Sequence, residues 1–313
     1  MDLQQNAVLS IVVPVYNEEE TIPLFLEKVV ALKREIIPYS FSFIFIDDGS
    51  TDQTLSVLRQ INQQDDNVHY VSLSRHFGKE AAIYAGLEKA KGDLVALMDV
   101  DLQDPPELLP EMLSALVSNE VDCVATKRSD RRQESAIRSF FSSLFYKVMN
   151  RFSQTEFVEG ARDFRMMNRS MVDAVLTLSE NQRFSKGIFS WVGFRTKYLS
   201  YEDRNRSAGQ SSWSFWGLFR YAVEGLVSFS TVPLTLVILL GFLTFTGSIL
   251  AGIFIVIRAL VSNSSVAGWP SMVTIILFIG GVQMLSIGVI GRYIAAIFFE
   301  TKNRPIYLAK EEK

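Results

Sequence analysis

LVALMDVDLQDPPE, residues 94–107, is the stretch that decides the fold of this chain. The apolar run Leu94–Met98 predicts a buried β-strand, and Asp99 and Asp101 follow it at alternate positions. Asp104 then precedes two prolines, with a glutamate three residues further on, a pattern typical of a helix start that Asp104 would cap. A strand therefore ends, two acids stand at its carboxyl end and a helix begins, which is where open α/β sheets bind ligands.

Oxygen-bearing side chains are concentrated in this loop, because Gln103 follows Asp99 and Asp101. Carboxylate and amide oxygens suit a hard divalent cation, Mg²⁺ or Mn²⁺, which commonly shares its coordination shell with phosphate oxygens. A pair of solvated loop acids explains the same two aspartates, since a D-x-D string is common. The rest of the chain has to decide between a metal site and an ordinary loop.

Strands alternate with helices over the first 126 residues. This alternation predicts an α/β fold with a doubly wound, mostly parallel sheet, and places polar groups at the carboxyl ends of its first, second and fourth strands. The expected strands are Leu9–Val15, Phe41–Ile46, Val68–Leu73, Leu94–Met98 and Val121–Thr126, and the expected helices are Ile22–Arg34, Gln53–Asn62 and Ala81–Ala90.

Neither a G-x-G-x-x-G nor a G-x-x-x-x-G-K-[ST] string occurs, which argues against a dinucleotide fingerprint and a P-loop. The phosphates of a bound nucleotide would then have to be held by a metal and by basic side chains. Glu18, Asp47 and Asp48, which follow the first two strands, could hold a ribose or a base. Helix capping is the alternative explanation for these acids.

Composition excludes some classes of function. The net charge of −3 gives no attraction to nucleic acid. The single cysteine, Cys123, lies in an apolar run, so we expect a buried core thiol and no intrachain disulfide, which fits a reducing compartment.

Two long segments, Val232–Ile257 and Pro270–Gly291, contain no Asp, Glu, Lys or Arg. Each exceeds the roughly 20 residues that cross a bilayer, so two membrane helices are expected rather than two buried soluble ones. The link Val261–Trp269 has no Lys or Arg, whereas basic residues flank the opposite ends. The positive-inside rule then places the N-terminal part and the C-terminal tail in the cytoplasm of the cell.

The expected organisation has four parts: a cytoplasmic α/β domain over residues 1–210, an interfacial amphipathic helix over 211–230, a two-helix membrane hairpin over 231–299 and a cytoplasmic tail over 300–313. Small residues recur in both membrane segments, which would permit close helix packing and a homo-oligomer.

Four motifs occur in a characteristic order: PVYNEE at 14–19, DDGSTD at 47–52, SRHFGKE at 74–80 and DVDLQDPPE at 99–107. In this set the chain resembles the family 2 glycosyltransferases of GT-A fold. More narrowly it resembles the polyprenyl-phosphate glycosyltransferases, namely dolichol-phosphate mannose synthase and the bacterial undecaprenyl-phosphate glucosyltransferases of the GtrB type. The resemblance covers nearly the whole chain, including the two apolar segments.

The resemblance implies roles for residues in all four motifs. The nucleotide would be held by Pro14, Tyr16, Glu18, Asp47 and Asp48, and the sugar-phosphate side would be contacted by Arg75 and Lys79. Asp101 and Gln103 would bind the metal directly, and Asp99 would hold the nucleotide, the sugar or the metal. His76 stands where these proteins often carry Asn, and we interpret it as a polar loop residue.

The acceptor phosphate would meet arginines between residues 128 and 138, where the candidates are Arg128, Arg131 and Arg138. Ser139–Phe152 then places apolar residues among Lys147 and Arg151, which is typical of an amphipathic helix lying on anionic lipid. Packing of this helix on the core of its own domain is the alternative.

Asp163 lies between Arg162 and Arg165, and pairing with these arginines would lower its pKa and keep it ionised. The resemblance makes Asp163 the candidate catalytic acid-base residue and places Arg162 at the substrate. The Q-x-x-R-W string of many family 2 members is absent, and its nearest equivalents are Gln182-Arg183-Phe184 and Lys186-Gly187 with Trp191. A phosphate monoester is already largely anionic at neutral pH, so Asp163 could instead orient the acceptor or hold the two arginines.

Residues 201–213 are polar and basic and predict a mobile loop able to close over the pyrophosphate. The related proteins have an R-x-x-G-x-S-K loop there, which Arg206 and Gly209 match, whereas Ser212 replaces the lysine. Arg204 or Arg206 would then neutralise the leaving group. A solvated linker to the membrane helix is the alternative.

The expected function is a metal-dependent, inverting transfer of a sugar, with glucose first, from a UDP-linked donor to a polyprenyl phosphate at the membrane. A flippase and a downstream glycosyltransferase would be partners. Two rival hypotheses are a family 2 transferase with another lipid or polysaccharide acceptor, and a non-catalytic membrane scaffold that binds a nucleotide sugar.

Overall fold

The computed structural model describes residues 7–36, 39–129, 146–147, 150–151, 155, 157–201, 227, 229–262 and 268–313. Four arginines that the sequence assigns to substrate lie outside these residues: Arg131, Arg138, Arg204 and Arg206. The amphipathic helices expected over 139–152 and 211–230 also fall almost wholly outside them, so both helices stay predictions.

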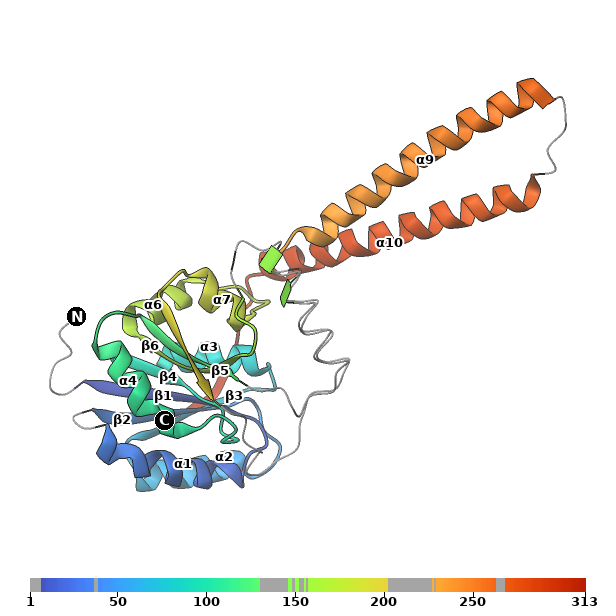
Figure 1. The fold of residues 1–313 in the computed structure, drawn as a ribbon. Coiled ribbons are helices and arrows are strands. Elements are labelled where there is room, and N and C mark those ends of the chain that lie inside the picture. Colours follow the sequence, from blue (N-terminus) through green and yellow to red (C-terminus); the bar gives the residue numbers. More distant parts are fainter. Residues whose placement is uncertain are drawn as a thin grey trace.

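An eight-stranded sheet forms the centre of the N-terminal domain, in the order β7-β5-β6-β4-β1-β2-β3-β8 (Figure 1). β1 pairs in parallel with β2 and β4, β2 with β3, and β5 with β7. β6 runs antiparallel between β4 and β5, and β8 runs antiparallel along β3. The strands are β1 (Val8–Val15), β2 (Ser40–Asp47), β3 (Val68–Leu73), β4 (Leu94–Leu97), β5 (Cys123–Arg128), β6 (Ala161–Asn168), β7 (Thr196–Tyr201) and β8 (Ala309–Glu312). The predicted α/β fold is confirmed, with two antiparallel strands that the sequence did not indicate.

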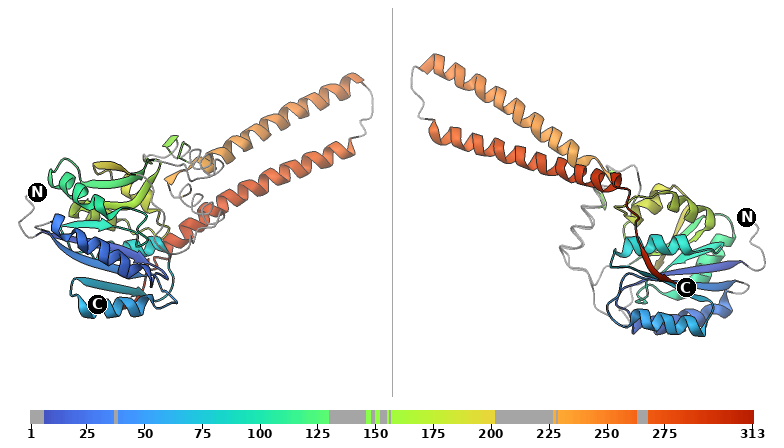
Figure 2. Two further views of the ribbon diagram at one scale, coloured as in Figure 1. Left: turned by 60° about the horizontal axis from the view of Figure 1, so that its bottom comes forward. Right: turned by 180° about the vertical axis from the view of Figure 1, so that it is seen from behind.

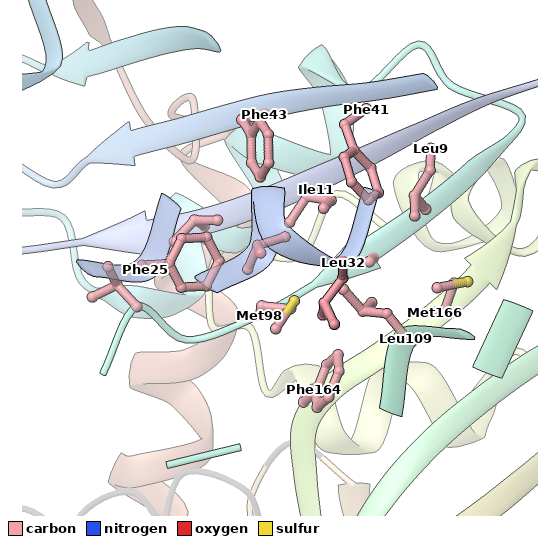
Figure 3. Close-up of a cluster of buried hydrophobic side chains, with 14 of the residues drawn as sticks. Leu9, Ile11, Phe25, Leu32, Phe41, Phe43, Met98, Leu109, Phe164 and Met166 are labelled. Atoms are coloured by element: carbon pink, nitrogen blue, oxygen red, sulfur yellow. The ribbon is translucent and has the colours of Figure 1, made fainter. Parts of the chain in front are cut away.

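Helices cover both faces of the sheet, because its central strands carry apolar side chains on both sides. On β1, Leu9 and Ile11 belong to one apolar cluster and Val12 to the other, as the alternation of side chains along a strand requires. Figure 3 shows part of the first cluster, which α1 (Thr21–Ala31), α2 (Thr54–Gln64) and α4 (Leu109–Val117) complete. The second is completed by α3 (Lys79–Lys89), α6 (Arg169–Thr177) and α7 (Ser185–Trp191).

Local predictions agree well with these elements. Val68–Leu73 has its predicted bounds, and the other expected strands and helices are present with ends shifted by a few residues. After α1 the chain continues as a short 3₁₀ helix, Leu32–Glu35, and another, Pro106–Leu108, precedes α4. Cys123 is a free, buried thiol as expected, and burial raises its pKa to about 11.

Two long helices, α9 (Val232–Ser262) and α10 (Trp269–Thr301), extend away from the domain as an antiparallel pair (Figures 1 and 2). Over Val232–Ile255 and Met272–Thr301 both are long and apolar enough to cross a membrane, with a mean hydropathy of 2.3 and none of that length buried inside the protein. The second stretch continues past Gly291, where the charge-free segment ends, and stops close to residue 299, the expected end of the hairpin.

Close packing joins the domain to the start of the hairpin. Phe229, just before α9, lies with its ring centroid 5.9 Å from that of Phe184 and 6.0 Å from that of Phe157. Gly187 on α7 makes room for this ring, since a Cβ atom there would lie 2.6 Å from it. Near the C-terminal end of α10, the Glu300 carboxylate accepts hydrogen bonds from the backbone N–H groups of Asn181 and Gln182.

The tail after α10 returns to the N-terminal domain and becomes β8, which covers the edge of β3 (Figure 2). Backbone hydrogen bonds of 3.0 and 3.1 Å join Tyr70 and Lys313 in both directions. Arg59 and Tyr70 both donate to Glu311, and these hydrogen bonds lower the pKa of Glu311 to about 2. Residues 309–312 of the expected tail are therefore a strand of the sheet. No local signal in the sequence indicated this strand.

Deleting residues 309–313 is expected to lower the melting temperature by a few degrees and to promote association, because β3 then becomes an open edge. Glu311 has a lowered pKa in the folded state, so its contribution is complete above its usual pKa of 4.5 and is lost as the pH falls towards about 2. The difference in melting temperature between the full-length and shortened proteins, measured by thermal unfolding in detergent, should shrink over that range.

The matched control is Lys310→Ala, because this exposed side chain is removed while the backbone of β8 is kept. Equal melting temperatures for the full-length and shortened chains would show that β8 adds nothing to the stability of the sheet.

Candidate active site

The loop after β4 carries Asp99, Asp101 and Gln103 at the carboxyl edge of the sheet. Asp101 is buried, and its Oδ1 accepts a hydrogen bond of 3.1 Å from the backbone N–H of Gln103. Leu102 between them has a φ of 57°, in the left-handed region that few residues other than glycine adopt. Backbone strain of this kind persists only where the surroundings impose it, and it is concentrated at functional sites.

Lys79 at the start of α3 joins two acids from different elements. Its Nζ lies 2.8 Å from Oδ1 of Asp99 and 2.6 Å from Oδ2 of Asp163. Asp163 is on β6, which runs antiparallel to β4. In this pairing Leu97 of β4 lies opposite Arg165 of β6. A single ammonium group therefore holds the first acid of the D-x-D string beside Asp163.

Opposing effects set the ionisation of this group. Burial alone would raise the pKa of Asp163, but three cations outweigh it and hold this pKa well below its usual value: Lys79, Lys186 and Arg165. Burial likewise opposes the charged form of Lys79, yet the carboxylates of Asp163 and Asp99 raise its pKa. The ionised Asp163 expected from the sequence is thus supported, with Lys79 rather than the flanking arginines as its ion-pair partner.

Arg162 and Arg165 are turned to other partners. Arg162 donates from Nε to Oδ1 of Asp104 at 3.0 Å and from a terminal nitrogen to Oε1 of Gln103 at 3.2 Å. Arg165 is buried, donates to the backbone carbonyls of Asp163 and Arg162, and lies 3.8 Å from the centroid of the Phe189 ring. Arg162 therefore fixes the side chain of the candidate metal ligand Gln103.

Asp104 does not cap a helix, so this prediction was wrong. The helical segment begins as a 3₁₀ turn after Pro105 without a side-chain cap. Asp104 instead accepts hydrogen bonds from Arg162 and from the Tyr201 hydroxyl at the end of β7. Burial raises the pKa of Asp104 against the opposing charge of Arg162. A buried carboxylate without an opposite charge is costly, which is the reason for its pairing with Arg162.

Asp48 organises the loop that follows β3. Its carboxylate accepts hydrogen bonds of 2.7 and 2.9 Å from the backbone N–H groups of Phe77 and Gly78, and it lies 2.8 Å from Nδ1 of His76. Burial raises the pKa of Asp48 despite these contacts. Gly49 permits the close approach, since it has a φ of 71° and a Cβ there would lie 2.5 Å from the backbone of Arg75.

The neighbouring acids also hold loops together. Asp47 accepts from the backbone N–H of Ser50 and from the hydroxyl of Ser72, at 2.9 and 2.8 Å. Glu18 accepts a hydrogen bond from the hydroxyl of Thr21 near the start of α1. Neither acid caps a helix, because α1 and α2 begin without a side-chain cap, so the capping alternative was wrong for them. Their binding of a nucleotide stays a prediction.

Aromatic and basic side chains surround this loop. Tyr16 is 41% exposed, and its ring centroid lies 4.3 Å from that of His76. The guanidinium of Arg75 lies 4.4 Å from the centroid of the Phe77 ring. Pro14 is at the end of β1 opposite Ile46. His76 is thus a loop residue, as expected, with the added role of joining Tyr16 to Asp48.

Arg128, the last residue of β5, pairs in register with Tyr201 on β7, and its backbone N–H donates to the carbonyl of Gly160. Register therefore places it at the same edge of the sheet as Arg162. Sequence reasoning did not identify Tyr201 as a neighbour of the site and gave Asp104 another role, because the partners of both residues lie far away in sequence. Lys186 lies in the segment that comes nearest to the Q-x-x-R-W string, and its charge acts on Asp163.

A divalent cation fits the donors at this edge. Asp99, Asp101 and Gln103 offer only oxygen atoms, which suits Mg²⁺ or Mn²⁺ and disfavours softer metals. Among the described residues, no group of three or more His, Cys, Asp and Glu side chains could enclose a metal by itself. Phosphate oxygens of a bound ligand would therefore have to complete the coordination shell.

Comparison with known proteins identifies the family. The model of glycosyl transferase family 2 matches residues 10–176, which include every described site residue from Pro14 to Arg165. This chain belongs to glycosyl transferase family 2. The N-terminal domain of this family 2 glycosyltransferase has the GT-A fold that the resemblance implied.

The relatives extend the similarity to the whole chain. The bactoprenol glucosyl transferase of Shigella phage SfV is 42% identical over 97% of this chain and 99% of its own length. The prophage bactoprenol glucosyl transferase homolog of Escherichia coli (strain K12) is 39% identical over 97% and 99%. Among solved structures, the mannosyl-3-phosphoglycerate synthase of Rubrobacter xylanophilus aligns with a TM-score of 0.49 and 17% identity over 70% of this chain and 72% of its own.

Proposed function

We propose that this glycosyltransferase moves glucose from UDP-glucose to the phosphate of a membrane polyprenyl lipid, with inversion at the anomeric carbon and with a divalent metal. The type of reaction follows from the family. The sugar and the lipid are supported by relatives of nearly the same length that are named bactoprenol glucosyl transferases. UDP as the carrier and inversion rest on the resemblance of the four motifs.

The observation that carries the proposal is the pairing of Asp99 with Asp163 through Lys79. It joins the loop that would bind the sugar diphosphate to an ionised acid on β6, within one hydrogen-bonded group. A solvated pair of loop acids would have no reason to be held by a half-buried cation, because partial desolvation of Lys79 carries a cost that fixed partners offset.

The proposed reaction needs no strong base. An oxygen of the lipid phosphate attacks C1 of the glucose, and the bond from C1 to the UDP oxygen breaks, so that UDP leaves with the bonding electron pair. A phosphate monoester has a second pKa of about 6, so the attacking oxygen is already anionic at neutral pH. An acid with a strongly lowered pKa is a weak base, so the role of Asp163 is to hold Lys79 and Asp99 in position.

A bound Mg²⁺ or Mn²⁺ would offset the charge of the departing diphosphate. Asp99, Asp101 and Gln103 are the residues that would hold it, with Arg162 fixing the Gln103 side chain. Pro14, Tyr16, Glu18, Asp47 and Asp48 are proposed at the nucleotide, and Arg75 at the sugar phosphate.

We further infer that α9 and α10 cross the bacterial cell membrane and keep the catalytic domain and β8 on its cytoplasmic side. Arg292 lies towards the domain end of α10, Lys302 and Arg304 follow its last residue, and residues 261–269 at the far end carry no Lys or Arg. A lipid-linked glucose made on that side would need a flippase and a downstream glycosyltransferase to be used outside.

A transfer assay tests the function. Full-length protein in detergent receives undecaprenyl phosphate, Mg²⁺ or Mn²⁺ and a panel of labelled UDP- and GDP-sugars. Label should pass into the lipid phase from UDP-glucose and should not do so with EDTA. Asp101→Ala should lower the rate by at least about 10²-fold, because a ligand is lost from the metal that would offset the charge of the leaving group.

Asp66→Ala, in the exposed turn before β3, is the matched control and should leave the rate unchanged. Nucleotide binding without transfer to this lipid would indicate another acceptor, such as a diacylglycerol or a polysaccharide. A protein that binds no nucleotide sugar would be a scaffold rather than the proposed enzyme.

A further inference from the structure

The start of α7 is attached to the residue that follows Lys79. Glu80 accepts hydrogen bonds from the backbone N–H of Ser185, at 2.9 Å, and from the Ser185 hydroxyl. Because Lys79 binds Asp99 and Asp163, these contacts place the first turn of α7 beside the candidate active site.

A second attachment fixes α7 to the strand that carries Asp163. The buried guanidinium of Arg165 stacks on Phe189 of α7, 3.8 Å from the ring centroid. The same guanidinium donates a hydrogen bond of 3.2 Å to the backbone carbonyl of Asp163. The orientation of α7 relative to Asp163 is therefore set by two contacts about one helical turn apart.

The third attachment leads to the membrane helices. Gly187 packs under the ring of Phe229, which precedes α9, with no room for a Cβ atom. Figures 1 and 2 show α7 on the side of the domain from which the long helices extend. Lys186 thus lies between Ser185, which is attached to the active-site helix α3, and Gly187, which is attached to the membrane hairpin.

Lys186 differs from Lys79 in its contacts. Asp163 makes its ion pair with Lys79, whereas Lys186 acts on Asp163 through its charge alone. Lys79 is shared between two carboxylates, so the group of one ammonium and two carboxylates is net negative and does not by itself attract another anion. A phosphate that reaches Asp99 and Asp163 from the membrane would be repelled by both acids unless a further cation meets it on that side.

We propose that Lys186 binds the phosphate of the polyprenyl acceptor at the point where the lipid leaves the membrane and enters the active site. The proposal rests on the lipid phosphate acceptor of the proposed function. It adds a lysine to the arginines that the sequence assigns to this phosphate. This lysine is on α7, the helix that Glu80, Arg165 and Phe229 contact through other residues. A compact ammonium group suits a phosphate monoester whose oxygens must stay free to attack.

Binding and turnover test the proposal separately. Full-length protein in lipid nanodiscs is titrated with undecaprenyl phosphate and, in parallel, with undecaprenol, which lacks the phosphate. Wild-type protein should prefer the phosphorylated lipid. Lys186→Met should weaken binding of undecaprenyl phosphate and raise its KM by about 10- to 100-fold, the effect of losing a charged hydrogen bond, while binding of UDP-glucose stays unchanged.

Two variants control for folding and for charge. Lys186→Arg should recover phosphate binding to within about tenfold, because the positive charge remains. Lys197→Met removes an exposed lysine of β7 and should behave as wild type. Inorganic phosphate should compete only weakly; saturation by inorganic phosphate as tight as by the lipid would mean that the site serves a free anion and would overturn the proposal.

The two failures can be told apart. If Lys186→Met keeps the wild-type preference for undecaprenyl phosphate, Lys186 is not a phosphate ligand, even when wild-type protein transfers glucose normally. If wild-type protein prefers the phosphorylated lipid, Lys186→Met loses that preference and no sugar is transferred, the lysine site stands and the proposed reaction fails. Equal binding of both lipids by wild-type protein would overturn the lysine site directly.

Discussion

Asp163→Asn is expected to lower the rate of glucose transfer by about 10²-fold or more, measured as kcat with saturating donor and lipid. Asparagine keeps the size of the side chain but removes the charge that draws Lys79 towards β6. Lys79 would then pair with Asp99 alone, and Asp99 would move out of its place beside the sugar diphosphate. The loss should appear in kcat more than in the KM for UDP-glucose, because the nucleotide-side residues are untouched.

The pH dependence separates positioning from general-base catalysis. Because its pKa is lowered in the folded state, Asp163 is ionised throughout the pH range above the usual pKa of an aspartate. Its contribution to folding stability is complete in that range and is lost only as the pH falls through the lowered pKa. The wild-type rate should therefore show no titration of Asp163 near neutral pH. A rise in kcat that follows a group near pH 6 to 7, present in wild type and absent in Asp163→Asn, would restore the general-base role.

Asp173→Asn is the matched control, because Asp173 is an exposed acid on α6 whose nearest basic partner, Arg169, lies 3.6 Å away. This variant should keep the wild-type rate and melting temperature. If Asp163→Asn keeps more than about a tenth of the wild-type rate while folding normally, the ion-pair group is not central to the reaction.

Gly187→Leu is expected to separate donor binding from lipid glucosylation. A side chain at this position must displace the Phe229 ring, because even the Cβ atom would lie 2.6 Å from it. Overpacking of this kind costs about 1–3 kcal/mol and would tilt the catalytic domain on its membrane hairpin. A misplacement of about 1 Å can lower a rate by roughly 10²-fold, so transfer to lipid should fall by that order while the affinity for UDP-glucose is kept.

A double-variant cycle tests the reason for this loss. Adding Phe229→Ala to Gly187→Leu removes the clashing ring and should restore part of the lost activity. Gly241→Leu, in α9 with no atom within 4 Å of its Cβ position, is the control for adding a side chain. If Gly187→Leu and Gly241→Leu have the same activity, the contact between α7 and Phe229 does not set the position of the active site.

Short-range patterns in the amino-acid sequence were sufficient to predict the first five strands, the helices between them and the two long apolar helices. Apolar runs of strand length, separated by helical periods, predicted β1 to β5 and the helices between them. Parallel strands bring their carboxyl ends to one edge, so the pattern alone placed Asp47 and Asp99 at that edge. The two long charge-free segments likewise specified α9 and α10, because composition and length alone define such helices.

Which charges meet depends on the tertiary fold. The ion pairs of Lys79 and the hydrogen bond from Tyr201 to Asp104 span elements distant in sequence. The antiparallel strands β6 and β8 also depend on contacts between segments that are distant in sequence. The edge of β3, for example, is paired by a tail that follows the two long helices. Such contacts are fixed by the register of the strands and by the need to compensate each buried charge, and neither leaves a periodic trace in the sequence.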